Sequence, residues 1–434
     1  MENENNKITW GSIIPLIGGL SIAASNTFGN NPDFIVSWNV FQHNDKHYVN
    51  YLRTKKNWSG KYYVLDYNEK NVVPDVTSEC SNLPYADVIC GCPPCAGLSS
   101  FSTTSSADSA VNDHMINAAH LVLETIKPKV YIFENAPRLS SEKGRPVADK
   151  LYKIASDNGY SLMLYSTESR LHGNCQIRPR TFGFFLKKSV FGDKCLHVMN
   201  IDERSGNYID FIKDALTSEN DPMRIVINKD IPSESPFYKY CFEYIHAENH
   251  EDFVNKMCIT QKSVNLLECA IKFANNDYVK LSEWMKEHGF DKIAEKMLYM
   301  KSKIDDGKGC WTHGITLGKY IIPAYIGVMP MSMVHPHEDR YINIRESMTL
   351  MGMPKDFELC GNKPHSDYNH VCQNVPVGTA EDMFKQIKYW FEHTENNENM
   401  QLDSDYVVNQ HKKHDFVINL KPKDETSSDI KTFF

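Results

Sequence analysis

The sequence predicts an α/β protein built around a doubly wound, Rossmann-like parallel sheet. Short apolar runs that close in Gly, Pro or polar residues alternate with helical patterns through the first part of the chain, as in βαβ units. Two of these runs end near reactive side chains: Cys95 follows the run 87–91, and Glu134 ends the run that begins at Lys129. Because chemistry in a parallel sheet lies beyond the carboxyl ends of its strands, both side chains are candidates for one active site.

The composition is that of an ordinary globular protein. The chain has 434 residues, 41% hydrophobic and 24% charged, which suits two or three domains. Its most apolar segment, 13–24, is too short and too rich in Gly and Pro to span a bilayer, so we expect no membrane contact. Twelve cysteines without a signal peptide favour reduced thiols. We therefore expect a cytoplasmic protein.

The net charge of −8 argues against a surface that is basic throughout. It does not exclude DNA, because a local basic cleft decides phosphate contact and the total charge does not. Nucleic-acid binding therefore stays open at this point.

The pattern of each segment gives its expected structure. In chain order we expect a strand over 8–17, a turn at Gly18-Gly19, a helix over 20–28, a strand over 34–38, a helix over 40–52, strands at 62–65 and 87–91, a helix over 111–126 and a strand from 129. A Gly turn before a helix can hold a nucleotide-like ligand, because the first turn of the helix presents free backbone N–H groups.

Cys95 stands directly after a strand and a double proline, where a nucleophile belongs. Two other interpretations compete with this one. Cys90, Cys92 and Cys95 could bind a metal, although no second Cys or His pair stands nearby at ligand spacing. An inert buried cysteine is the more serious alternative. The Ser/Thr-rich stretch 99–108 that follows predicts a loop able to close over a substrate.

Taken in chain order, the motifs resemble those of the DNA (cytosine-5) methyltransferases. The Pro-Pro-Cys95 loop matches the family pattern G-x-P-P-C-Q, with Ala96 in place of Gln. Glu134-Asn135 matches E-N-V, and Gln176-x-Arg178-x-Arg180 precedes a strand, as in the family. The segment 340–357 looks like the family's R-x-L-T-x-R-E element, and 372–376 resembles its closing G-N-x-V-P.

This resemblance implies methyl transfer from S-adenosylmethionine to carbon 5 of cytosine in double-stranded DNA, as in restriction–modification systems. Cys95 would add to carbon 6 of the ring, and a protonated Glu134 would donate toward N3. Arg180 would hold O2 of the base, and Arg178 would brace the loop. Carbon 6 is inaccessible in stacked DNA, so the resemblance also implies base flipping.

The cofactor motif departs from the family pattern. Members read D-x-F-x-G-x-G-G, whereas this chain has Ser12, Ile14 and Leu16 before Gly18-Gly19, so the aromatic and the first glycine are missing. Asn39 stands where the family has an acid for the ribose hydroxyls, and Asp75 matches the acid that faces the adenine amino group. The cofactor-binding positions that the resemblance implies are Ile14, Gly18, Gly19, Leu20, Asn39, Asp75, Pro94, Gln373 and Val375.

Three alternatives remain open on the sequence alone. The first is an RNA cytosine methyltransferase of the same fold, which would need a smaller recognition domain. The second is a catalytically silent DNA-binding module, suggested by the altered cofactor motif. The third is an enzyme that uses a modified donor or acts on an already modified base.

The motifs divide the chain into parts. We expect a catalytic domain formed by 8–189 and 337–392, with an inserted target-recognition domain over 190–336 and a flexible tail over 393–434. Apolar residues share helix faces within 264–271, 281–285 and 293–300, which indicates core stripes rather than a DNA-reading surface.

The tail ends in apolar residues that its polar composition does not explain. Ile430, Phe433 and Phe434 would share one face of a helical turn. The pattern resembles the short peptides that hold sliding clamps, so a clamp is one candidate partner. The alternative is that the two phenylalanines fold back onto the enzyme itself.

Overall fold

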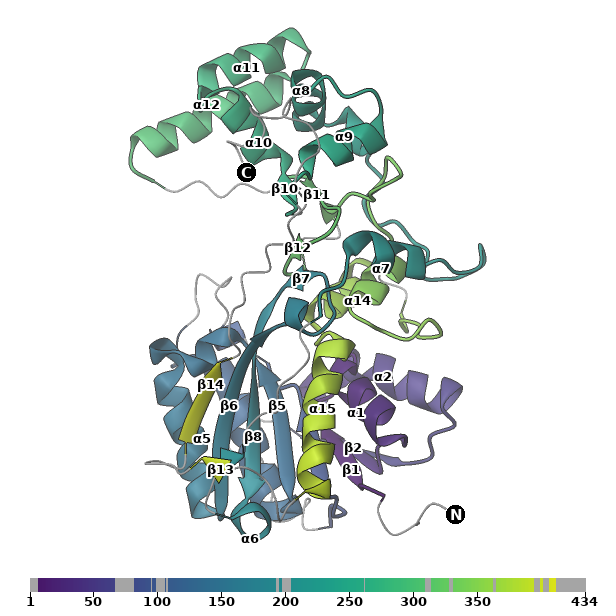
Figure 1. Cartoon of the computed structure of the whole chain (residues 1–434), viewed down its shortest axis with the longest axis vertical. Helices are drawn as coiled ribbons and strands as arrows, with labels where there is room; N and C mark the ends of the chain where they lie inside the picture. The colour runs from purple at the N-terminus through teal and green to yellow at the C-terminus, as the bar shows by residue number, and fades with distance from the viewer. Residues whose placement is uncertain are drawn as a thin grey trace. The chain divides into compact units, whose positions relative to one another are not determined.

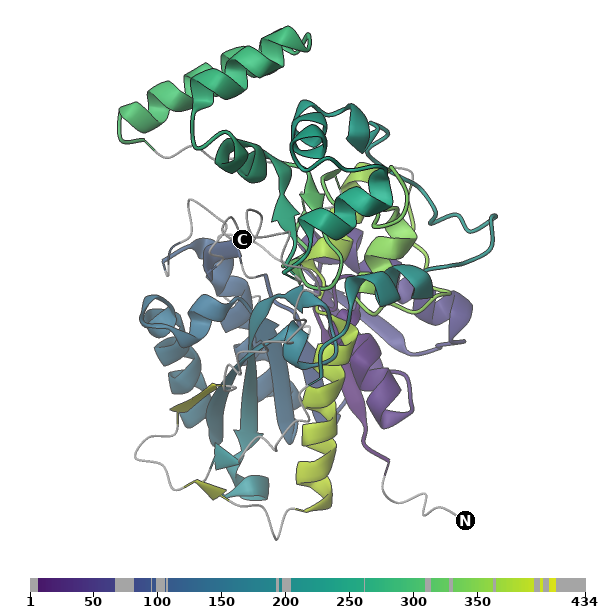
Figure 2. The same cartoon turned by 45° about the horizontal axis from the view of Figure 1, so that its top comes forward.

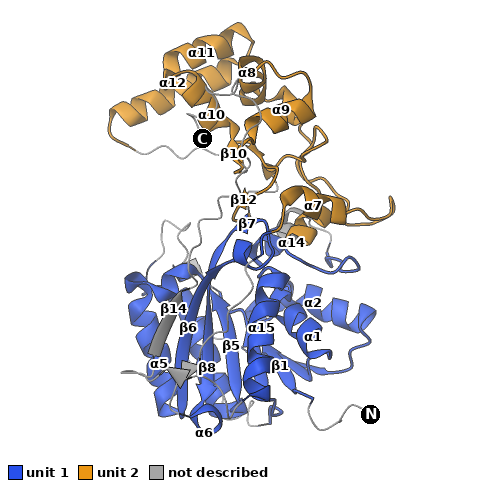
Figure 3. Cartoon of the chain, viewed as in Figure 1, with its two compact units in different colours: residues 1–205, 351–413 blue, residues 206–350, 414–434 orange. Residues whose placement is uncertain are grey.

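The computed structural model divides the chain into two compact units (Figure 3). Unit 1 comprises 1–205 and 351–413, and unit 2 contains 206–350. The structure describes residues 7–410 except for 67–81, 95, 99–105, 107, 193–194, 197–203, 261, 309–313, 328–330, 362–363, 394–398 and 401–405. Each unit is described separately.

Unit 1 is built on an eight-stranded sheet with the order β14-β6-β8-β5-β4-β1-β2-β3 (Figure 1). Its strands are β1 (Trp10–Ile13), β2 (Phe34–Trp38), β3 (Lys61–Leu65), β4 (Val88–Gly91), β5 (Val130–Asn135), β6 (Tyr160–Glu168), β8 (Pro179–Lys187) and β14 (Tyr406–Gln410). Strands β1 to β5 pair in parallel, whereas β8 runs antiparallel to both β5 and β6. The fold is the doubly wound α/β sheet that the sequence predicts.

The strands form because their residues are apolar and closed by turn residues. All residues of β1, β2, β4 and β5 are buried, as expected for parallel strands covered on both faces. The predicted strand over 8–17 is shorter in the structure and ends at Ile13. Ile14 and Leu16 have φ values of 49° and 53°, which an extended strand cannot contain.

Helices cover the sheet on both faces (Figures 1 and 2). One layer contains α4 (Asp113–His120), a π-helical turn (Leu121–Ile126) and α5 (Arg145–Asp157), which bury their apolar faces in one core with the strands. The predicted helix over 111–126 is therefore interrupted by a change of helix type. On the other face, α15 (Val377–Glu392) packs Trp390 against Phe184 of β8, and its Phe384 contacts Phe28 of α1 (Gly19–Phe28).

The remaining elements of unit 1 are short or peripheral. They are α2 (Gln42–Lys55), β7 (Gln176–Ile177), α6 (Lys188–Phe191), β9 (Cys195–Leu196), α14 (Pro364–Gln373) and β13 (Asn399–Met400). Part of the predicted tail is ordered into strands: β14 pairs in parallel with β6, and β13 pairs with β9. The pairing of β9 with β13 also keeps 195–196 in unit 1, beyond the expected boundary at residue 189.

Unit 2 is mainly helical. Its helices are α7 (Tyr208–Asp214), α8 (Pro236–Tyr244), α9 (His250–Met257), α10 (Leu266–Phe273), α11 (Tyr278–Glu287), α12 (Asp291–Asp305) and α13 (Ile344–Leu350), with short strands β10 (Val264–Asn265), β11 (Thr316–Leu317) and β12 (Ile322–Pro323). The predicted stripes are core stripes: Leu267, Leu281 and Met297 are all buried in one cluster.

The segment 340–350 belongs to unit 2, although it carries a motif that we assigned to the catalytic domain. Arg345 forms a bidentate pair with Asp221, with nitrogen–oxygen distances of 2.7 and 3.0 Å, and its side chain is 2% exposed. Arg340 binds Glu346 in the same way. The pair between Arg345 and Asp221 ties 340–350 to the chain near residue 221, whereas the pair between Arg340 and Glu346 lies within the segment. The compact unit extends to residue 350 rather than 336.

Candidate functional site

The carboxyl ends of the five parallel strands lie at one edge of the sheet, as their register requires. Ile13 of β1 pairs with Val36 of β2 and with Gly91 of β4, and Gly91 pairs with Phe133 of β5. The residues that follow these ends therefore gather at this edge. They include the turn after Ile13, Asn39 after β2, Asp66 after β3, Pro93 and Pro94 after β4, and Glu134-Asn135 at the end of β5.

Glu134 and Arg180 form an ion pair at this edge. The distance from Arg180 Nε to Glu134 Oε1 is 2.6 Å, and the Arg180 and Glu134 side chains are 16% and 9% exposed. They meet because β8 runs antiparallel to β5: Asn135 pairs with Thr181, so the beginning of β8 lies beside the end of β5. Two residues that the sequence placed in one catalytic set are thus in direct contact.

Burial raises the pKa of the Glu134 carboxyl above its usual range, and the nearby Arg180 and Arg178 guanidinium groups oppose this rise. The direction of this shift makes the protonated form of the carboxyl group more accessible than it is for an exposed glutamate. A group of this kind can donate a proton or a strong hydrogen bond to a substrate heteroatom.

Asn135 connects this pair to the Pro-Pro-Cys loop. Its Nδ2 donates to the backbone oxygen of Pro93 at 3.3 Å, and its own Oδ1 accepts from Ala136 N. The side chain is fully buried. Cys95, the predicted nucleophile, lies outside the described residues, but this contact holds Pro93, two residues before it, against Asn135, the neighbour of Glu134 in the chain.

Arg178 is fully buried and points away from solvent. Its Nη2 donates to two backbone carbonyl oxygens, those of Cys372 and Asn374, each at 2.9 Å. A guanidinium group with this environment braces the chain segment that it binds. The contact joins the Gln176-x-Arg178-x-Arg180 stretch to the closing segment 372–376.

The turn between β1 and α1 has an unusual backbone. Ile14, Leu16 and Gly18 all have positive φ, at 49°, 53° and 94°. Glycine adopts such angles freely, but a β-branched or bulky residue does so only where its surroundings impose them. Gly19 is also sterically required, because a Cβ there would collide with Asn374 Oδ1 and with the backbone oxygen of Val375.

Asn374 is a site residue that the sequence analysis did not select. Its Oδ1 accepts from Gly19 N at 2.8 Å, and its Nδ2 lies 2.9 Å from Met353 Sδ. The neighbouring Gln373 is exposed, whereas Val375 is buried next to Gly19. The Asn in the Cys-Gln-Asn-Val-Pro segment was the available signal, since the family element also contains an amide.

Asn39 is exposed at the end of β2, and its Nδ2 donates to Asp66 Oδ1 at 3.2 Å. Asp66 follows the last residue of β3 and is a second residue that the sequence analysis passed over, although its position directly after a strand marks it. The pair brings a carboxylate next to the amide that stands in the family's acid position. Asp75, the other predicted acid, lies outside the described residues.

The described cysteines before the loop show no sign of a metal site. Cys90 is fully buried, and burial raises the pKa of its thiol to about 12. Within the part of the chain that the structure describes, no three His, Cys, Asp or Glu side chains are grouped to hold an ion.

The described helices include none that is long and apolar enough to cross a membrane.

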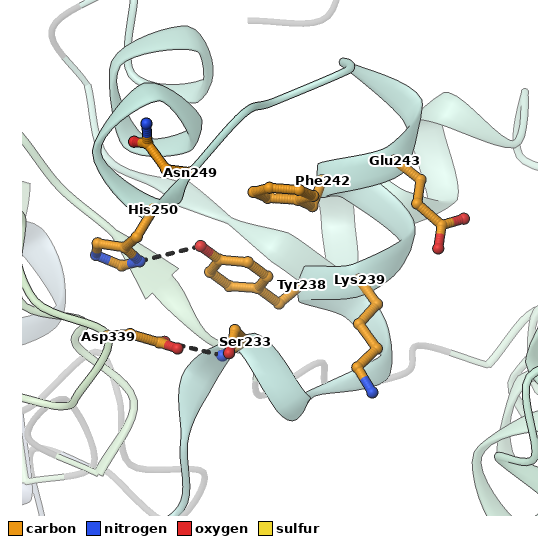
Figure 4. Close-up of a pocket in the computed structure, with 8 residues that line it drawn as sticks. All are labelled: Ser233, Tyr238, Lys239, Phe242, Glu243, Asn249, His250 and Asp339. Carbon is orange, nitrogen blue, oxygen red and sulfur yellow. Dashed lines mark hydrogen bonds between the residues drawn. The ribbon is translucent and has the colours of Figure 1, made fainter.

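Unit 2 has a pocket of about 280 Å³ beside α8 and α9 (Figure 4). Tyr238 and Phe242 contribute rings, and His250 accepts a hydrogen bond from the Tyr238 hydroxyl while it donates to the backbone oxygen of His335. Asp339 accepts from Ser233 N. Among the described residues, no lining side chain has a buried polar atom without a partner, so the pocket indicates no particular ligand.

Comparison with known proteins gives one family over most of the chain. Residues 11–389 match the profile of the C-5 cytosine-specific DNA methylases. A curated relative is DNA (cytosine-5)-methyltransferase 2 of Arabidopsis thaliana, 22% identical over 368 residues, which cover 75% of this chain and 23% of that protein. The chain thus spans about a quarter of the length of that relative.

A second relative is a putative type II methyltransferase of Methanocaldococcus jannaschii, 24% identical over 209 residues, which cover 42% of this chain and 65% of that protein.

Solved structures give the same fold. A putative DNA modification methyltransferase encoded within an Escherichia coli prophage has a TM-score of 0.52 and 18% identity, covering 89% of this chain and all of that one. The Entamoeba histolytica methyltransferase EhMeth has a TM-score of 0.53 and 11% identity, covering 89% and 99%. None of the comparisons supports a sliding-clamp partner. Ile430, Phe433 and Phe434 lie outside the described residues, so that interaction stays a prediction.

Proposed function

Because the chain belongs to the C-5 cytosine-specific DNA methylase family, we propose that it transfers a methyl group from S-adenosylmethionine to carbon 5 of cytosine in double-stranded DNA. The observation that carries this proposal is the pair between buried Glu134 and half-buried Arg180, which Asn135 connects to the loop that leads toward Cys95. A carboxyl group and a guanidinium group therefore meet at the sheet edge from which the Pro-Pro loop leaves β4.

The reaction begins at carbon 6, because carbon 5 of cytosine is a poor nucleophile. The Cys95 thiolate adds to carbon 6 and forms a carbon–sulfur bond, and the electron pair of the 5,6 double bond moves into the ring toward N3. Glu134 in its protonated form donates to N3 and stabilises the charge that develops there. The raised pKa of Glu134 supports this role, because only the protonated acid can donate.

Arg180 has two tasks in this scheme. Its contact with Glu134 fixes the orientation of the carboxyl group, and its N–H groups beyond those that bind Glu134 and the backbone oxygen of Pro179 can donate to O2 of the base. Arg178 does not reach substrate, because both its burial and its two carbonyl partners commit it to bracing segment 372–376. The reaction ends when solvent water takes the proton from carbon 5 and the electron pair of that carbon–hydrogen bond re-forms the 5,6 double bond. The Cys95 sulfur leaves carbon 6 with its bonding electrons, and the proton on N3 returns to Glu134.

The residues of the turn between β1 and α1 and those at the ends of β2 and β3 fit a nucleoside-containing methyl donor. The Gly18-Gly19 turn leads into the N-terminus of α1 at the sheet edge, a position that suits a nucleotide-like ligand, and Asn39 with Asp66 offers an amide and a carboxylate to hydroxyl or amino groups. Leu20, Pro94 and Val375 are the apolar positions assigned to the same donor, with Asp75 as a further acid. When bound, S-adenosylmethionine supplies the electrophilic methyl group for carbon 5.

Duplex DNA that contains 5-fluorocytosine tests the proposal. With S-adenosylmethionine present, the chain should form a covalent adduct that survives denaturing electrophoresis, because fluorine at carbon 5 cannot leave as a proton. Cys95→Ser should form no adduct and lose turnover, since a serine hydroxyl is not ionised at neutral pH without a base beside it.

The control is unmodified duplex, which should become methylated by wild-type protein and leave no lasting adduct. Mass spectrometry of the digested DNA identifies the base and the added group. A wild-type chain that binds donor and DNA yet forms no adduct would contradict Cys95 as nucleophile. Equal labelling of transfer RNA and duplex DNA would contradict the assignment of DNA as substrate.

A further inference from the structure

The turn between β1 and α1 is held in place by a carboxylate from another element. Leu16, at φ 53°, stands where the resemblance places the first glycine of the cofactor motif. The structure thus keeps a left-handed backbone at a position that has lost the residue best suited to it. Such an angle persists at a leucine only where neighbouring contacts determine it.

Asp45 of α2 provides that contact. Its Oδ1 accepts a hydrogen bond from Leu16 N at 2.9 Å, and its Oδ2 accepts one from the Tyr62 hydroxyl of β3 at 3.0 Å. The side chain is completely buried. Both oxygens therefore bind groups from other elements, and the carboxylate links α2, β3 and the turn.

A purely local role does not explain this residue. Asp45 lies in the first turn of α2, where an acid interacts favourably with the helix dipole, but exposed acids do this without the cost of burial. It is not an N-cap, because its partners are outside the helix. Burying a carboxylate is costly unless hydrogen bonds compensate for the lost water. The left-handed turn directs the Leu16 N–H group toward Asp45, so this hydrogen bond is one of those that compensate.

We propose that Asp45 is a positioning residue that replaces the missing glycine by holding Leu16 in the turn conformation that binds the methyl donor. The inference rests on the proposed function, since the turn can affect binding of S-adenosylmethionine only if the chain uses this methyl donor. It predicts that Asp45 is needed because residue 16 is a leucine and becomes dispensable when residue 16 is a glycine.

The test measures S-adenosylmethionine binding by calorimetry for four forms of the full chain: wild type, Asp45→Ala, Leu16→Gly and the double variant. Asp45→Ala should weaken donor binding about tenfold, the scale expected for a hydrogen bond to a charged group. The double variant should bind at least as tightly as Asp45→Ala alone, and within about threefold of Leu16→Gly. Asp45→Asn, which keeps an oxygen for Leu16 N, should stay within about threefold of wild type.

Asp33→Ala is the matched control. Asp33 Oδ2 accepts from Trp10 N at 3.1 Å, so it is also a carboxylate on a backbone amide, but at the opposite end of β1. This variant should leave donor binding unchanged. Hydrogen exchange at Leu16 N should become faster in Asp45→Ala and not in Asp33→Ala. This measurement reports the hydrogen bond to Leu16 N in the absence of S-adenosylmethionine.

The outcomes separate the two proposals. A wild-type chain that binds no donor would overturn the proposed function. Donor affinity that is equal in wild type and Asp45→Ala would overturn the positioning role and leave the proposed function standing. Equal losses when Asp45→Ala is added to the wild-type chain and to the Leu16→Gly chain would also overturn it, because the effect would then be general stability rather than support of the leucine.

Discussion

The two halves of the candidate site, which we propose to face the base and the methyl donor, keep their geometry in different ways. In the base-facing half, Glu134, Asn135, Arg178 and Arg180 all match the family pattern, and the register of β5 against β8 brings Glu134 to Arg180. In the donor-facing half, the aromatic, the first glycine and the ribose acid are replaced by Ile14, Leu16 and Asn39. There Asp45 and Asn374, which come from other elements, hold the backbone of the turn by hydrogen bonds, and Asp66 provides a carboxylate beside Asn39.

This difference teaches that a turn can keep its shape when residues outside the turn support it. Strand register fixes the base-facing half because hydrogen-bonded neighbours cannot shift without breaking the ladder. The donor-facing half lies in a turn, where the ladder to the neighbouring strands continues only as far as Ile14. Beyond Ile14 the backbone is held by one turn hydrogen bond, from Gly18 N to Pro15 O, and by the side chains of Asp45 and Asn374. Substitutions should therefore act on chemistry in the first half and on donor affinity in the second.

Among substitutions in the described residues, the largest effect should come from Glu134→Gln. The glutamine keeps the size and most contacts of the glutamate but cannot deliver a proton, so the rate of methyl transfer should fall by roughly 10² to 10⁴. Donor affinity should be unchanged, because Glu134 lies in the base-facing half. Single-turnover kinetics and calorimetry measure the two quantities. A tenfold loss of donor affinity would show that the two halves are not separable.

A second effect concerns pH and unfolding. Burial raises the pKa of Asp45 to about 7, against hydrogen bonds from Ser37, Tyr62 and Leu16 N that lower it. The folded chain then binds more protons than the unfolded chain between about pH 4 and 7, so the free energy of unfolding should fall as the pH rises through that window. The slope is about 1.4 kcal/mol per pH unit at most for one group, and it should vanish above the window.

Asp45→Asn provides the reference for this measurement, because an amide does not titrate. The difference in unfolding free energy between wild type and this variant should decrease from pH 5 to pH 7. The ionisable group facing Asp45 is the Tyr62 phenol, whose own pKa is raised by burial and by the carboxylate, with Arg53 acting on that phenol. Tyr62→Phe should move the window upward. A difference that is constant with pH would mean that Asp45 titrates normally.

The smallest effect should come from Asp66→Asn. The Asn39 amide would lose a charged hydrogen-bond acceptor, and S-adenosylmethionine would lose a carboxylate partner at the end of β3. We expect donor affinity to fall by about tenfold with little change in the rate at saturating donor. Asn39→Asp, which restores the family's acid, should compensate in the double variant. If Asp66→Asn lowers only the rate, the carboxylate serves chemistry and the division into halves is wrong.

The sequence by itself determined the sheet, the chain order of the motifs and the identity of Glu134 and Arg180 as partners in one site. These follow from local patterns: apolar runs of strand length, turns that close them, and polar residues directly after them. The second strand, over Phe34–Trp38, agrees with its predicted bounds because its pattern depends on neighbouring residues alone. The role of Arg178 as a brace was likewise expected, and its two carbonyl partners are consistent with it.

Only the tertiary structure decided which residues support the donor-facing half. Leu16 and Asp45 are 29 residues apart, and Gly19 and Asn374 are 355 apart, so no local pattern joins them. A buried aspartate in a helix looks like any first-turn acid until the fold shows which N–H it faces. The same holds for 340–350, whose motif suggested the catalytic domain, but whose paired charges to Asp221 place it in unit 2. The spacing of residues in the sequence determines which segments form helices and strands. Hydrogen bonds between buried groups that are far apart in the chain form only when these helices and strands pack together.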